Sequence, residues 1–93
     1  MKTIYEISIA IYEDGKFECD GTPRKYWEVV AERKSLKAAL NVGKKLRKRE
    51  NVVDADVRGF DLVLNAFGKL SQGDTIYHAF ILENGEVYNM NAG

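Results

Sequence analysis

Residues 33–49 read RKSLKAALNVGKKLRKR, and this stretch contains the clearest helix pattern in the chain. Its small and apolar residues recur at the spacing of one side of an α-helix, namely Leu36, Ala39, Leu40, Gly43 and Leu46. Ser35 stands just before them, where a hydroxyl can accept hydrogen bonds from the free amides of the first turn. The stretch predicts one main helix over about residues 35–49, packed on one face of a sheet.

Gly43 lies near the centre of the apolar side of this predicted helix. A glycine in a helix interior costs roughly 1 kcal/mol relative to alanine. We expect close approach of the helix backbone to the sheet at this position to compensate for that cost.

The first strand is indicated by residues 3–12, TIYEISIAIY, in which apolar and other residues alternate. Tyr5, Ile7, Ile9 and Ile11 then share the face that packs against the helix. Glu13-Asp14-Gly15 predicts a turn with Gly15 left-handed, followed by a second strand over residues 16–20. That hairpin would pair Ile11 with Phe17 and Ile9 with Cys19.

Three further segments have strand character. Residues 26–33 predict a strand with Trp27, Val29 and Ala31 on one side and Tyr26 and Val30 on the other. Residues 53–58 alternate apolar with charged side chains, which favours a position near a sheet edge. Residues 75–83 and 86–91 predict a closing hairpin around Asn84-Gly85.

Residues 61–72 fit two structures. Val63, Ala66, Phe67 and Leu70 have helical spacing, whereas Leu62-Val63-Leu64 could equally extend a strand. We predict a short second helix over about residues 61–72. The fold class is therefore α+β: a mainly antiparallel sheet of five or six strands with one main helix, in a single domain of residues 1–93.

The composition is that of a small globular domain, with 93 residues of which 45% are hydrophobic and 30% charged. No apolar run approaches the roughly 20 residues that a membrane helix needs, and the first residues do not resemble a secretory signal. The single cysteine, Cys19, cannot form an internal disulfide. We expect a cytoplasmic protein that does not bind membranes.

No set of residues with catalytic or metal-binding spacing is apparent. His78 is the only histidine and has no partner in sequence, and Cys19 has no second cysteine with which to bind zinc. Asp54 and Asp56 point to one strand face without a visible third ligand. The glycines form neither a phosphate loop nor a dinucleotide-binding motif. We expect no enzyme activity, no metal and no cofactor.

Charge is unevenly distributed although the net charge is zero. Residues 33–49 hold eight of the 14 basic residues and no acidic one. Five cations are predicted on the solvent side of the helix: Lys37, Lys44, Lys45, Lys48 and Arg49. Such a stripe can be a solvated surface near acidic strands, a contact for an acidic protein, or a contact for nucleic-acid phosphates.

Aromatic residues are the second feature, with one Trp, five Tyr and four Phe. One helix covers only one sheet face, so some aromatic side chains should be exposed on the other. We place Tyr12, Tyr26 and Tyr88 there as candidate partner-binding residues, since tyrosine is a common interface anchor. A protein partner, or a second copy of the chain in a homodimer, would cover them.

These features favour a small non-catalytic protein-binding module. In size and type alone, the chain is similar to small phage and mobile-element proteins that inhibit a host or defence complex. The alternative is a nucleic-acid-binding accessory protein that uses the basic helix over residues 33–49.

Overall fold

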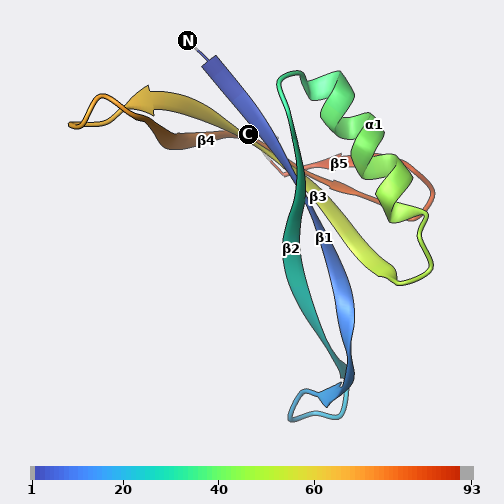
Figure 1. Cartoon of the computed structure of the whole chain (residues 1–93). Helices are drawn as coiled ribbons and strands as arrows, with labels where there is room; N and C mark the ends of the chain where they lie inside the picture. The colour runs from blue at the N-terminus through green and yellow to red at the C-terminus, as the bar shows by residue number, and fades with distance from the viewer. Residues whose placement is uncertain (1, 91–93) are drawn as a thin grey trace.

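The computed structural model describes residues 2–90, which form an antiparallel five-stranded sheet with one helix (Figure 1). The elements are β1 (Lys2–Phe17), β2 (Pro23–Arg33), α1 (Leu36–Arg47), β3 (Val52–Leu64), β4 (Leu70–Ile81) and β5 (Val87–Asn89). The strand order in the sheet is β2-β1-β3-β4-β5. The predicted α+β class with one main helix is confirmed. Asn91, the predicted end of the last strand, lies outside the described residues.

Helix α1 lies over one face of the sheet (Figure 1). Ser35 caps it as predicted, because its hydroxyl accepts a hydrogen bond from the backbone N of Ala38 at 3.2 Å. The helix ends at Arg47 with Lys48 as its C-cap, slightly before the predicted end. It is too short to cross a membrane, and it is the only helix in the described part of the chain.

The hydrophobic core fills the space between α1 and the sheet. Its buried members are Ile7, Ile9, Ala39, Leu46, Val52, Ala55, Val57 and Ile81. The alternation in β1 correctly predicted which of its side chains face the helix. Gly43 is also buried, and a Cβ added there would lie 3.1 Å from Ile81 Cγ1. The expected close approach of helix and sheet is confirmed.

The predicted first hairpin is wrong. β1 continues through the Gly15 region to Phe17, and the chain reverses at residues 18–22 instead. Gly15 does have a positive φ of 73°, but it lies in a bulge between two paired segments of β1. The reversal is stabilised by Asp20, whose side chain accepts hydrogen bonds from the backbone N and the hydroxyl of Thr22.

Because β1 and β2 are longer than predicted, the residues that pair in this hairpin differ from the predicted ones. Ile11 pairs with Tyr26 rather than Phe17, and Ile9 pairs with Glu28 rather than Cys19. No separate strand over residues 16–20 is formed, and the described sheet has five strands.

The predicted second helix over residues 61–72 is also wrong, and the strand alternative is correct. β3 extends to Leu64 and β4 begins at Leu70. Asn65 closes the turn between them, because its side-chain oxygen accepts hydrogen bonds from the backbone N atoms of Phe67 and Lys69. Cross-strand pairing therefore satisfies the backbone that a helix would otherwise have satisfied internally.

The charged strand β3 is central rather than at an edge, since β1 and β4 pair with its two sides. Its central charged residues, Asp54, Asp56 and Arg58, occupy the face turned away from α1. The charged residues of this strand had predicted a position at the sheet edge. They occur instead in a central strand, because no second helical layer within residues 2–90 covers the face on which they lie.

A bulge in β2 changes which of its residues face the helix. Ile7 pairs with Ala31 while the next residue of β1, Ser8, pairs with Val29. Val30 is the extra residue between them. Ala31 therefore faces α1, but Trp27 and Val29 lie on the opposite face, so the prediction that all three share one side is wrong.

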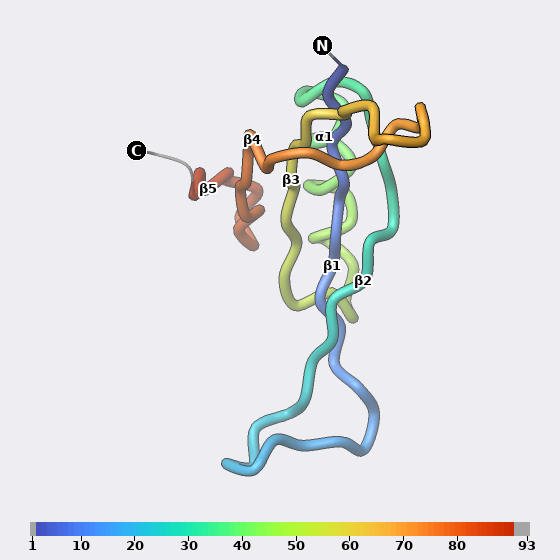
Figure 2. The backbone as a smooth tube through the Cα atoms, turned by 90° about the vertical axis from the view of Figure 1, so that its left-hand side faces the viewer, coloured from blue at the N-terminus to red at the C-terminus, as the bar shows by residue number. Residues whose placement is uncertain are grey.

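Two hairpin ends extend beyond the helix-covered part of the sheet. Figure 1 shows the turn of β1 and β2 and the turn of β3 and β4 projecting in different directions, and Figure 2 shows the first of them reaching far from α1. The core is thus confined to the middle of the sheet.

Candidate binding site on the outer face

The outer face is the side of the sheet opposite α1. Its central residues lie on alternate positions of each strand and pair with one another across neighbouring strands. They are Ser8, Ala10, Trp27, Val29, Asp54, Asp56, Arg58, His78, Phe80 and Tyr88. Figure 1 shows no second layer over it in the part of the chain drawn as ribbon. The sheet thus has one face covered by α1 and one face without a covering layer in the described residues.

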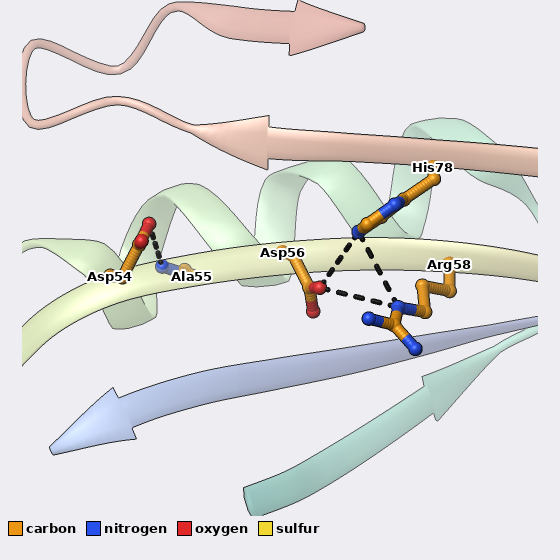
Figure 3. Close-up of polar contacts among 5 residues, drawn as sticks. All are labelled: Asp54, Ala55, Asp56, Arg58 and His78. Atoms are coloured by element: carbon orange, nitrogen blue, oxygen red, sulfur yellow. Dashed lines mark hydrogen bonds and ion pairs between the residues drawn. The ribbon is translucent and has the colours of Figure 1, made fainter. Parts of the chain in front are cut away.

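Asp56 is the centre of this face and is only 2% exposed. Its Oδ2 lies 2.9 Å from His78 Nε2 and 3.4 Å from Arg58 Nε (Figure 3). Strand β3 places Asp56 and Arg58 two residues apart on one face, and His78 of β4 lies directly opposite Arg58 in the sheet. Three strongly polar side chains are thereby brought together at mid-sheet.

Arg58 only partly neutralises this carboxylate. Its side chain is 52% exposed, so solvent weakens the ion pair with Asp56. The same Nε atom also lies 3.4 Å from His78 Nε2. The guanidinium group is therefore at the rim of the site rather than beneath it.

The second oxygen of Asp56, Oδ1, is buried and has no hydrogen-bond partner among residues 2–90. Figure 3 shows it turned away from His78. A buried polar atom without a partner typically costs about 1–3 kcal/mol, and more when the group is charged. The site is therefore incomplete as a hydrogen-bonded network.

A pocket of about 340 Å³ lies beside this carboxylate. Its lining residues are Ser8, Trp27, Glu28, Val29, Asp56, Arg58 and Phe80. Trp27 and Phe80 meet edge to face with ring centroids 6.1 Å apart, and the His78 ring lies 5.1 Å from Phe80. The pocket thus combines aromatic walls with a buried acidic group.

The three predicted tyrosines are not all on the outer face. Tyr12 and Tyr88 lie there and are exposed. Tyr26 pairs with Ile11, so it lies on the helix side of the sheet, and that prediction is wrong because the bulge at Val30 shifts the alternation in β2. Tyr26 is nevertheless exposed.

The predicted basic residues lie on the other side of the molecule. Lys37, Lys45, Lys48 and Arg49 are exposed and Lys44 is partly buried. No ion pair joins any of these five to an acidic residue in the described part of the chain. Arg49 lies beyond the end of α1, in the turn that leads to β3.

The Asp56–His78 contact is the feature that sequence reasoning missed. The two residues are 22 positions apart, and only the pairing of β3 with β4 brings them together. The prediction treated residues 53–58 as an edge segment, so His78 had no expected partner. Asp54 does not join the cluster, because its carboxylate accepts a hydrogen bond from the backbone N of Ala55.

The His78 side chain makes its hydrogen bonds within the cluster. Its Nε2 contacts Asp56 and Arg58, and it makes no hydrogen bond to a hydroxyl or thiol within residues 2–90. No group of three His, Cys, Asp or Glu side chains suited to a metal occurs in that same part of the chain.

A second exposed apolar surface lies at the end of β3 and β4. Its members are Val63, Leu64, Phe67 and Leu70, of which Phe67 is 87% exposed. Among residues 2–90, Asp56 is the one buried polar residue, and it belongs to the outer face rather than to this surface.

Comparisons with protein-family models, with curated proteins and with solved structures found no match to this chain. The site is therefore interpreted from its own geometry.

Proposed function

We propose that the chain is a non-catalytic protein-binding module whose outer face binds the partner. The observation that carries the proposal is a central sheet face left without a covering layer, on which Trp27 is 42% exposed and Val29, Tyr12 and Tyr88 are also exposed. Exposed apolar patches of this kind are typical of interaction sites. Tryptophan and tyrosine dominate binding energy in many interfaces.

The arrangement of this face resembles the anatomy of a protein interface. Aromatic and aliphatic side chains surround a buried polar centre, and charged residues lie around them. Such a face would act by occupying a complementary surface of the partner. Inhibition of a host or defence complex is the form of this function that we favour.

Nucleic-acid binding through the helix side is the second candidate. It is favoured by five cations that have no acidic partner in the described residues: Lys37, Lys44, Lys45, Lys48 and Arg49. Phosphate contacts by such side chains supply affinity without sequence preference. Tyr12, Trp27 and Tyr88, which could stack on bases, lie on the opposite side of the sheet, and of the predicted tyrosines only Tyr26 is on the helix side, which makes this candidate the weaker one.

Capture from a host-cell lysate separates the two candidates. The immobilised chain is compared with an outer-face variant, Trp27→Ala with Tyr88→Ala, and a helix-side variant, Lys37→Glu with Lys44→Glu and Lys48→Glu. We expect a defined protein that resists nuclease treatment, is lost with the outer-face variant and is retained by the helix-side variant. The reverse pattern, with loss after nuclease, would support nucleic-acid binding and reject the proposal.

A homodimer formed through the outer face is tested by a separate measurement. Sedimentation of the purified chain over a concentration series detects a homodimer, and the same outer-face variant then tests whether this face forms it. A dimer that persists in the outer-face variant would place the interface elsewhere.

A further inference from the structure

The pocket beside Asp56 presents an unusual combination of groups for an isolated domain, a buried carboxylate oxygen without a donor and two aromatic walls. We propose that this pocket receives a cationic side chain of the protein partner, with the guanidinium of arginine as the best fit. The inference rests on the proposed function and specifies what the outer face recognises.

The first step concerns the unfilled hydrogen bond. Asp56 Oδ2 already contacts His78 and Arg58, whereas Oδ1 has no donor within the described chain. A carboxylate accepts up to about four hydrogen bonds, and charge-assisted bonds from guanidinium are among the strongest available. Because Oδ1 is closed to solvent in the free chain, an incoming N–H donor would have to move the pocket lining aside before it could complete this network.

The second step concerns the walls of the pocket. Trp27 and Phe80 form an edge-to-face pair at its side, and Trp27 remains accessible. Tryptophan provides the most favourable aromatic face for a cation, and arginine stacks on such faces through its flat guanidinium. The aliphatic part of the same side chain would contact Val29.

The third step concerns charge around the pocket. Acidic residues outnumber basic ones by one among the paired outer-face positions of β1, β2 and β3: Glu6, Glu32, Asp54 and Asp56 against Lys2, Lys25 and Arg58. An acidic surface attracts a basic partner and repels phosphate groups. This charge distribution favours a protein cation over a nucleic acid as the occupant.

Arg58 is the internal competitor for this pocket. It reaches the same carboxylate from the rim, at 3.4 Å and half exposed. The partner's cation therefore has to displace Arg58 toward solvent. Arg58→Gln removes the positive charge and keeps a shorter polar side chain, and it should strengthen binding of an external cation.

The test is an NMR titration with a small probe, N-acetyl-arginine methylamide. The chain has one tryptophan, so the indole N–H of Trp27 gives a single assigned signal. We expect this signal and the Asp56 amide to shift with saturation on the order of millimolar, as befits a single side chain. The neutral isostere N-acetyl-citrulline methylamide should bind about tenfold more weakly, since the charge-assisted bond is lost.

Variants then assign the interaction. Asp56→Asn should weaken probe binding about tenfold, and Arg58→Gln should strengthen it severalfold. Trp27→Leu, followed through the Asp56 and Ser8 amides, serves as the second variant if Asp56→Asn does not fold. Unchanged chemical shifts of Ala39, which is buried in the core on α1, are the control for an intact domain.

Equal shifts with arginine and citrulline probes, or none with either, would overturn the inference. Its failure is distinct from failure of the proposed function. One outcome is that the Asp56→Asn variant captures a partner as well as the natural chain does, while the Trp27→Ala and Tyr88→Ala variant loses it. In that case the outer face binds the partner, but the pocket beside Asp56 does not bind a cation. If neither change affects capture, the proposed function itself is wrong.

Discussion

The two faces of the sheet are built from the same strands and differ in every other respect. On the covered face, Ile7, Val57 and Ile81 are fully buried against α1 and one another. On the outer face, the alternating positions carry the Asp56 cluster and exposed aromatic residues. The comparison teaches that the single helix layer places the buried core on one face only, and that the other face keeps exposed aromatic side chains, to which we assign binding as a proposal.

The largest expected effect comes from the covered face. Ile7→Ala should lower the free energy of unfolding by about 2–5 kcal/mol, since it leaves a cavity in a thin core. Val29→Ala, at an exposed outer-face position of the adjoining strand, is the matched control and should cost less than about 1 kcal/mol. Urea unfolding measures both. Equal losses would mean that the outer face is part of the core.

Gly43 tests how closely the helix approaches the sheet. A leucine there would collide with Ile81, so Gly43→Leu should cost about 1–3 kcal/mol or more. Gly43→Ala should change stability much less, because the gain in helix propensity of roughly 1 kcal/mol offsets a slight displacement of the flexible Ile81 side chain. Thermal unfolding compares the two, and a leucine variant as stable as the natural chain would contradict the packing described above.

Tyrosine substitutions test the same comparison of the two faces, with smaller expected changes in stability. Tyr12→Ala and Tyr88→Ala remove exposed outer-face side chains and should each change stability by about 0.5 kcal/mol or less. Both should weaken partner capture or dimerisation. Tyr26→Ala is the control, because Tyr26 lies on the helix side of the sheet and its loss should leave binding intact.

The smallest expected effect is a pH dependence on the covered face. Burial, and secondarily the neighbouring Tyr5, raise the pKa of Tyr77 above its usual value of 10.0. In the unfolded chain Tyr77 ionises first, so its contribution to stability is present below pH 10 and is lost as pH rises through the raised pKa. Tyr77→Phe should flatten the decline in stability in that alkaline range, as followed by denaturant unfolding. An unaltered decline would show that Tyr77 is not its source.

Local patterns predicted the parts of the fold that depend on local interactions. Ser35 and the apolar spacing after it located α1, and the alternation of residues 3–12 identified the helix-facing side of β1. The errors arose where distant pairing decides structure. Asn65 closes a turn within a segment whose spacing also fits a helix, and the bulge at Val30 reverses the faces of β2.

The candidate site was predictable only in part, for the same reason. Exposed outer-face positions for Tyr12 and Tyr88 follow from alternation within single strands. The contact of Asp56 with His78 requires the register of β3 against β4, and the pocket beside it requires β2 as well. No local spacing encodes those relationships.

The most direct test of the account is a footprint of the chain in its captured complex. Hydroxyl-radical oxidation reports on the aromatic side chains, and acetylation reports on the lysines, in the free and the partner-bound chain. We predict protection of Trp27 and Tyr88 with unchanged labelling of Lys37 and Lys48. Protection of the lysines with unchanged oxidation of Trp27 would contradict the assignment of binding to the outer face.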